Sequence, residues 1–190
     1  MESKRGVLVE YGSFSTEKLP RFRRRRASKA STRTPLLLSF CYNLPMISKS
    51  VEETGKIAQK LAKTTKTKTD QATIITLSGD LGSGKTTFAK VFAENFGIHE
   101  RDVVSPTFVI MKSYDLDKKK FNFKKFVHID AYRLEKAEEI EKLGWKNLID
   151  DPKNLILIEW PENIVEAVPK NAKEISFKFI DENTREIVFN

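Results

Sequence analysis

The stretch ITLSGDLGSGKTTFAKVFAENFG, residues 75–97, combines three patterns in immediate succession. Its first residues continue the β-branched run QATIITL, which predicts a buried strand. A glycine-rich turn follows the strand, and Gly97 is placed to end the next element in the left-handed conformation. Between the two, apolar residues recur at helical spacing, at Phe88, Val91, Phe92 and Phe96. The stretch therefore predicts a strand, a loop and a helix in that order.

The glycine-rich turn fits the phosphate-loop (P-loop) pattern G-x-x-x-x-G-K-[ST] at every fixed position. Glycines let successive backbone amides turn toward phosphate oxygens, and the following helix directs its positive end at them. Lys85 can reach β- and γ-phosphates, and the Thr86 hydroxyl can take part in a Mg²⁺ site. A chance match is the alternative, but strand and helix flank the loop as the motif requires. The predicted nucleotide-binding residues are Gly79, Asp80, Leu81, Gly82, Ser83, Gly84, Lys85, Thr86 and Thr87.

A P-loop also needs an acidic partner for the metal at the end of a neighbouring strand. Two carboxylates meet this requirement, because Asp130 ends the apolar run FVHID and Glu159 ends LILIE. A single carboxylate in such a place is often a helix cap or a surface charge. Two of them in a P-loop protein can divide the work, one in the metal shell and one placing the attacking water.

Four other residues near these motifs have two interpretations each. Thr107 in SPTF (105–108) can sense a γ-phosphate through Mg²⁺, or the Ser-Pro pair can simply start a turn. Arg133 can stabilise phosphate charge or pair with a nearby glutamate. His128 alternates with Val and Ile, which favours a structural or surface histidine over a catalytic one. Trp160 is either core or a wall near the nucleotide.

The rest of the chain predicts an α/β fold of the P-loop NTPase type, with helices flanking a mixed sheet and β-hairpins added to it. Ser50 and Glu53 form the sequence of a capping box, which predicts the start of a helix. TFVIMKSYDL and KKFVHIDAYRL read as one hairpin, and EISFKFIDENTREIVFN reads as a second. EKAEEIEKLGW, residues 135–145, reads as one helix, and NLILIEW reads as a short buried strand that stops before Pro161.

Charge and composition separate the chain into two parts. The net charge is +8, and residues 1–45 carry ten Lys/Arg against three Glu, whereas residues 46–190 are nearly neutral. We therefore expect a basic, disordered extension at 1–45 and a P-loop ATPase domain at 46–190. The single cysteine, Cys41, rules out an internal disulfide and fits the cytoplasm, and no apolar run reaches the length of a membrane span.

The stretch RFRRRRASKASTRTP within the extension leaves three interpretations open. Clustered arginines attract RNA phosphates without needing a fold. An organelle-targeting segment is the second interpretation, although Glu2, Glu10 and Glu17 depart from the acid-poor composition of such segments. The third, which we favour, is upstream sequence that the domain does not need.

Motifs that are missing from the sequence narrow the class of nucleotide-binding enzyme to which the chain can belong. No Asn-Lys-x-Asp motif for reading guanine occurs, which argues against a GTPase. A P-loop small-molecule kinase remains the alternative, but such kinases close an arginine-bearing lid over the transferred phosphate. The arginines of the domain, Arg101, Arg133 and Arg185, are scattered.

Four motifs in this order, GDLGSGKTTF, SPTF, HIDAYRL and EWPE, make residues 46–190 resemble the TsaE (YjeE) family. These are P-loop ATPases of tRNA threonylcarbamoyladenosine synthesis. The resemblance implies Mg²⁺-dependent ATP hydrolysis that serves TsaB and TsaD, with tRNA reached indirectly through that complex. It implies that Thr86 and Glu159 hold Mg²⁺ and that Asp130 supports hydrolysis.

The same resemblance assigns supporting roles to other residues. It places Ser48 and Arg185 around the nucleotide, whereas Lys85 and Thr107 join the catalytic group through the phosphate-contact and γ-phosphate-sensing roles described above. Two departures from the family pattern are mild: Ser83 stands where Ala is expected, and the basic extension has no counterpart.

Overall fold

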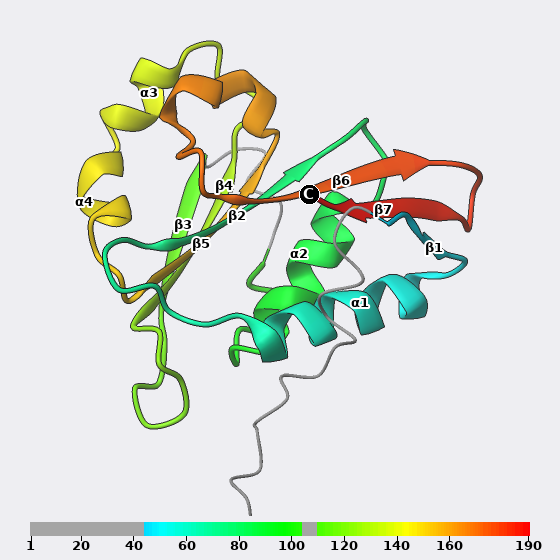
Figure 1. Ribbon diagram of the computed structural model, residues 1–190, viewed down its shortest axis with the longest axis horizontal. Helices are drawn as coiled ribbons and strands as arrows, with labels where there is room; N and C mark the ends of the chain where they lie inside the picture. The colour runs from blue at the N-terminus through cyan, green and yellow to red at the C-terminus, as the bar shows by residue number, and fades with distance from the viewer. Residues whose placement is uncertain (1–43, 104–109) are drawn as a thin grey trace, which may run out of the picture. The chain divides into compact units, whose positions relative to one another are not determined.

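The computed structural model describes residues 44–103 and 110–190 of the chain. Strands and helices alternate up to α2, and the later elements include the consecutive strand pairs β3–β4 and β6–β7 (Figure 1). The strands are β1 (Met46–Ser48), β2 (Thr73–Ser78), β3 (Met111–Asp115), β4 (Lys125–Asp130), β5 (Asn154–Glu159), β6 (Lys173–Phe179) and β7 (Arg185–Phe189). The helices are α1 (Val51–Thr64), α2 (Lys85–Glu94), α3 (Ala137–Glu141), α4 (Trp145–Ile149) and the 3₁₀ helix η1 (Pro161–Ala167).

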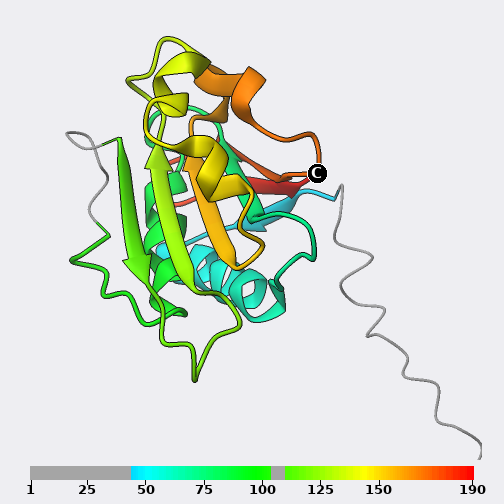
Figure 2. The same cartoon turned by 90° about the vertical axis from the view of Figure 1, so that its left-hand side faces the viewer.

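The strands of the described residues form one mixed sheet in the order β1-β7-β6-β2-β5-β4-β3. In its centre β2 runs parallel to β5 and β6, and β4 runs parallel to β5. The outer pairs β1–β7, β6–β7 and β3–β4 are antiparallel, and Figure 2 shows the arrows of β3 and β4 side by side in opposite directions. The predicted mixed sheet with hairpin additions is confirmed.

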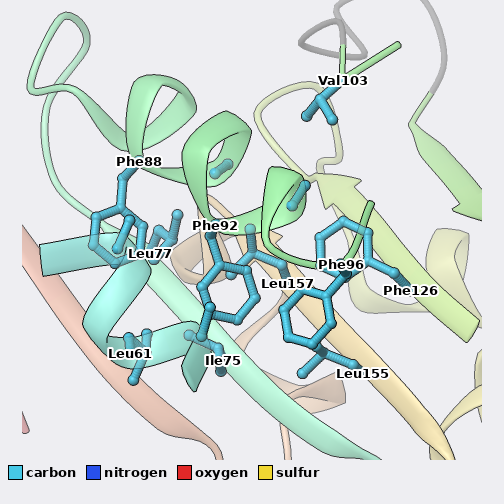
Figure 3. Close-up of a cluster of buried hydrophobic side chains, with 14 of the residues drawn as sticks. Leu61, Ile75, Leu77, Phe88, Phe92, Phe96, Val103, Phe126, Leu155 and Leu157 are labelled. Atoms are coloured by element: carbon cyan, nitrogen blue, oxygen red, sulfur yellow. The ribbon is translucent and has the colours of Figure 1, made fainter. Parts of the chain in front are cut away.

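The sheet buries apolar side chains on both faces. Figure 1 shows α1 (cyan) and α2 (green) on one side and α3 (yellow) and η1 (orange) on the other. Alternate residues of β2 divide accordingly, because Ile75 and Leu77 join the cluster under α1 and α2 and Ile74 joins the opposite one. Phenylalanines dominate the first cluster, where Phe92 and Phe96 of the α2 region pack against Phe126 of β4 (Figure 3). Helix α2 is thereby fixed over the central strands.

Helix α1 begins with the predicted cap. The Ser50 hydroxyl accepts a hydrogen bond from the Glu53 amide at 3.2 Å. The Glu53 carboxylate accepts one from the amide of Lys49, one residue before the cap, at 2.7 Å. The first bond satisfies an amide that the helix start leaves without a partner, and the second ties the preceding residue to the first turn.

The single helix predicted for residues 135–145 is wrong. The structure has two five-residue helices there, α3 and α4. Gly144 lies between them with φ 79°, a left-handed conformation that interrupts an α-helix. Trp145 then opens α4, and its indole Nε1 donates a hydrogen bond to the Ala167 carbonyl at 2.9 Å.

Strand β1 and helix η1 had no counterpart among the predicted elements. β1 is only three residues long and pairs with β7, the last of the described strands along the chain. The expected separation of residues 1–45 from the domain stays a prediction, because positions 1–43 lie outside the described residues. No helix among the described residues is long and apolar enough to cross a membrane.

Gly79, directly after β2, holds the P-loop against the neighbouring strand. Its φ is +128°, and a β-carbon at this position would overlap the carbonyl oxygen of Phe177 in β6. Gly82 also has a positive φ, +76°, but nothing lies within 4 Å of the place a β-carbon would take. Both positions therefore require a positive φ, but only Gly79 also requires that no β-carbon be present.

We predict that Gly79→Ala lowers the free energy of unfolding by at least about 2 kcal/mol, because backbone strain and overlap add. The control Gly82→Ala should cost about 1 kcal/mol, from backbone strain alone. Urea denaturation of both variants measures the difference. Equal losses would show that the approach to Phe177 places no demand on this position.

Candidate functional site

The functional side chains gather where the parallel strands β2, β5 and β4 end. Glu159 is the last residue of β5 and stands in register with Leu77 of β2 and Asp130 of β4. The P-loop leaves β2 at Gly79, so the predicted loop and both predicted carboxylates meet at one edge of the sheet. In open α/β sheets this edge is where ligands bind.

The P-loop itself turns on glycines and ends in a helix with open amides. Gly79, Gly82 and Gly84 all have positive φ. Gly84 is the N-cap of α2 and supplies no side-chain hydrogen bond to the first turn. Such an N-terminus attracts anions. Of the predicted loop residues, Asp80, Leu81 and Gly82 are exposed, whereas Ser83 is buried.

Lys85 lies folded over this loop. Its Nζ donates to the carbonyls of Gly79 at 2.6 Å and Asp80 at 2.9 Å, and only 4% of the residue is exposed. Burial lowers the pKa of the Lys85 ammonium, and Glu159 leads a set of carboxylates that oppose the shift. The Lys85 ammonium is therefore partly removed from water, while nearby carboxylates favour its charged form.

A chain of hydrogen bonds crosses the site through Glu159. The Thr86 hydroxyl donates to Glu159 Oε2 at 2.7 Å. On the other side, His128 Nε2 lies 2.9 Å from Glu159 Oε1. Glu159 is 1% exposed and His128 is fully buried. The carboxylate is thus bonded through both oxygens, which a buried charge requires.

Asp130 sits beside this chain with 9% of its surface exposed. Its Oδ1 accepts a hydrogen bond from the Tyr132 amide at 3.0 Å, which fixes the turn after β4. Asn163 of η1 braces the same turn, because its Nδ2 donates to the carbonyls of Ala131 and Tyr132. The Asp130 carboxylate therefore stands on a rigid strand end.

Trp160 forms a wall of the site. It is the one non-glycine residue with a positive φ, 61°, in the part of the chain that the structure describes. Its ring centroid lies 3.8 Å from Lys85 Nζ and 4.9 Å from the ring of Tyr132. Trp160 thus packs against the buried cluster on one side of the sheet and also lies over the P-loop lysine, whereas its predicted place beside a nucleotide stays a prediction.

Two of the remaining predicted residues line a small depression of about 70 Å³ beside the loop. Thr87 and Arg185 line it together with Ser50 and Gly84. The Arg185 guanidinium donates to the Gly82 carbonyl at 3.3 Å and lies 4.6 Å from the Phe179 ring centroid. The β6–β7 hairpin is thereby tied to the P-loop.

Ser48 and Thr107 stand apart from this group. Ser48 is fully buried, and its hydroxyl bonds to Thr54 Oγ1 at 2.8 Å and to the Ser50 carbonyl, so it supports the first turn of α1. Thr107 and the rest of SPTF lie outside the described residues, and the sensor role stays a prediction.

His128 fits the structural interpretation offered for it, but the sequence did not predict its place in the site beside Glu159. The surface alternative is wrong, because the residue is fully buried, and its partner is the strand-end carboxylate. A signal was present in the strand itself: His128 lies at even spacing from Phe126 and Asp130, which places all three on the face that α2 covers.

Sequence comparison agrees with this geometry. The family profile "Threonylcarbamoyl adenosine biosynthesis protein TsaE" matches residues 48–187, which include every element from the end of β1 into β7. The chain belongs to the TsaE family. Its place is therefore in tRNA threonylcarbamoyladenosine biosynthesis.

Individual relatives and a solved structure support the same membership. The TsaE protein of Rickettsia felis is 37% identical over 140 residues, 74% of this chain and 75% of that protein. The TsaE protein of Bacillus subtilis is 39% identical over 138 residues, 73% of this chain and 79% of that protein. The crystal structure of Bacillus subtilis YdiB aligns with a TM-score of 0.55 and 31% identity, over 77% of this chain and 83% of that one. The fold is that of a P-loop NTPase.

The P-loop NTPase fold of this family implies that a nucleotide binds here. The side chains at the site fit a nucleotide that carries magnesium. Mg²⁺ prefers oxygen ligands and takes few from the protein when phosphates supply others. The Thr86 hydroxyl and Glu159 Oε2, 2.7 Å apart beside the P-loop, are such a pair. Within residues 44–103 and 110–190, no group of three or more His, Cys, Asp or Glu forms a separate metal cage.

We predict that Thr86→Val destabilises the protein without nucleotide or magnesium by about 1–3 kcal/mol, because a buried carboxylate oxygen loses its donor. The adjacent Thr87→Val is the matched control, since the Thr87 hydroxyl makes no hydrogen bond within the described chain. Urea denaturation compares the two, and equal stabilities would mean that the bond to Glu159 contributes nothing measurable.

Proposed function

We propose that the protein binds ATP with Mg²⁺ and hydrolyses it in support of a complex of TsaB and TsaD. The observation that carries the proposal is the Thr86–Glu159 hydrogen bond next to Lys85 at the mouth of the P-loop. Hydroxyl, carboxylate and ammonium are the groups that a P-loop NTPase places around the β- and γ-phosphates.

The chain's own residues divide the work as follows. The loop amides from residues 79–86 and the N-terminus of α2 bind the phosphates. Lys85 exchanges its bonds to the Gly79 and Asp80 carbonyls for phosphate oxygens of the nucleotide. Thr86 and Glu159 hold the metal, which neutralises charge that develops on the phosphates.

Asp130 is the proposed group that orients the attacking water. Its carboxylate follows β4 in register with Glu159, so the two acids stand side by side at the strand ends. Its Oδ1 accepts a hydrogen bond from the amide of Tyr132, two residues further along the chain, and this bond holds the side chain in place. Thr107, on the SPTF loop, is proposed to sense the γ-phosphate and to pass that state to the partner proteins.

Support for partner-directed action comes from membership of the TsaE family, whose members are named for tRNA threonylcarbamoyladenosine biosynthesis. The depression lined by Thr87 and Arg185 beside the P-loop measures about 70 Å³, and a larger hollow of about 650 Å³ is lined by Ser78, Pro161 and Glu162. Thr87 and Arg185 are proposed to contact the nucleotide on the side away from the γ-phosphate. We infer that hydrolysis resets TsaB–TsaD between catalytic cycles, and that tRNA is reached only through that complex.

Steady-state ATPase rates with and without TsaB–TsaD test the function directly. We expect slow hydrolysis by the protein alone and at least about tenfold stimulation by the heterodimer, a barrier change of about 1.4 kcal/mol. Lys85→Ala should lose ATP binding and both rates, whereas Lys90→Ala on the same helix should keep them. Thr107→Ala should retain ATP but lose stimulation. Equal rates in every mixture would refute the partner-directed ATPase.

The two acids should fail in different ways. Glu159→Gln should weaken Mg²⁺-dependent nucleotide binding, because it removes charge from the metal shell. Asp130→Asn should bind nucleotide normally and lose about 10²–10⁴-fold in turnover. Calorimetric titration with a non-hydrolysable ATP analogue and ATPase rates with partners separate the effects. Normal turnover by Asp130→Asn would disprove its assigned role.

A further inference from the structure

The Glu159 carboxylate has two oxygens in unequal situations. Oε2 faces the Thr86 hydroxyl, at the position where the proposed metal ligands meet. Oε1 faces away from that hydroxyl and is bonded to His128 Nε2 at 2.9 Å. A carboxylate bonded at one oxygen keeps its plane and direction while the other oxygen changes partner, and metal ligands are commonly oriented in this way.

His128 is itself held rigidly. It lies inside β4, paired antiparallel with Lys112 of β3 and parallel with Leu157 of β5, and none of its surface is exposed. Both neighbouring strands fix its backbone, and close packing around the fully buried ring restricts its rotation. It therefore presents Nε2 to Glu159 from the scaffold of the sheet, while Thr86 approaches the same carboxylate from helix α2.

The second ring nitrogen distinguishes this role from simple filling of the core. Nδ1 of His128 is buried and has no hydrogen-bond partner among the described residues. A proton on Nδ1 would be a donor without an acceptor, so the tautomer that fits carries its proton on Nε2 and donates to Glu159. An apolar side chain would satisfy this place in the core better, since it would leave no buried nitrogen unpaired.

We propose that His128 is a positioning residue for magnesium: its Nε2–H holds Oε1 of Glu159 so that Oε2 stays directed at the metal position beside Thr86. The inference rests on the proposed function, in which Thr86 and Glu159 hold the metal. His128 itself touches neither metal nor nucleotide.

Three substitutions separate positioning from packing. His128→Leu removes the donor and keeps an apolar volume. His128→Gln carries an amide N–H near the place of Nε2, whereas His128→Asn carries one near the place of Nδ1, too short to reach Glu159. His99→Gln is the control, because His99 is exposed on the turn after α2. Circular dichroism melting identifies any variant that does not fold, and the Gln–Asn pair decides the question if the Leu variant fails.

The readouts are binding of a non-hydrolysable ATP analogue in EDTA, its binding as Mg²⁺ is titrated, and electron paramagnetic resonance of Mn²⁺ bound with the analogue. We expect His128→Leu and His128→Asn to raise the metal concentration for half-maximal binding by about 10–100-fold. Analogue affinity in EDTA should stay within about twofold of wild type. His128→Gln should recover most of the metal affinity.

Wild-type metal dependence in both His128→Leu and His128→Asn would overturn the inference. A loss of analogue binding in EDTA as large as the loss with Mg²⁺ would also overturn it, because it would indicate a packing role alone. Glu159→Gln is measured in parallel. If Glu159→Gln shifts the metal dependence and the His128 variants do not, only the positioning role fails. If Glu159→Gln leaves it unchanged, the metal assignment in the proposed function fails, and the role of His128 fails with it.

Discussion

Burial of the Glu159 carboxylate at the end of β5 is the constraint around which the site is built. A charge with 1% of its surface exposed needs hydrogen-bond donors close by. One donor comes from helix α2 through Thr86, and the other comes from strand β4 through His128. A single side chain therefore fixes the start of α2 against the centre of the sheet, and with it the P-loop that runs between them.

The same requirement explains why the aromatic core and the site are not independent. Phe88 and Phe92 anchor α2 on the sheet from below the loop, with Phe88 against Phe177 of β6 at a centroid separation of 5.3 Å. Thr86 lies in the first turn of α2, two residues before Phe88. Packing thus sets the height of the helix over the strands, and the hydrogen bond to Glu159 sets its rotation at the N-terminus.

Local patterns were sufficient to predict most of the fold. The P-loop, the Ser50 cap and the two hairpins each depend on residues close together in sequence, and the structure forms all of them. The break at Gly144 was missed because helical spacing on both sides hid one left-handed residue. β1 was missed because a three-residue strand exists only through its pairing with β7, about 140 residues away in sequence.

The candidate site divides in the same way. Motif positions such as Lys85 and Thr86, and the strand-end acids Asp130 and Glu159, follow from sequence because each has a local signature. His128 and Trp160 do not, since their roles come from neighbours brought in by other strands. Trp160 has a left-handed backbone, and its amide donates a hydrogen bond to the Leu77 carbonyl at 3.2 Å, a contact between residues far apart in sequence.

The close approach of Gly79 to Phe177 has a consequence for biosynthesis on the ribosome. β2, which leads into the P-loop, is flanked in the finished sheet by β5 and by β6, and both are translated after it. The loop meets Phe177 at its first residue and Arg185 at Gly82. A nascent chain that has emerged only as far as β5 has the complete phosphate motif in sequence but lacks the strand that shapes it. The finished geometry of the P-loop therefore depends on contacts with strands that are translated after it.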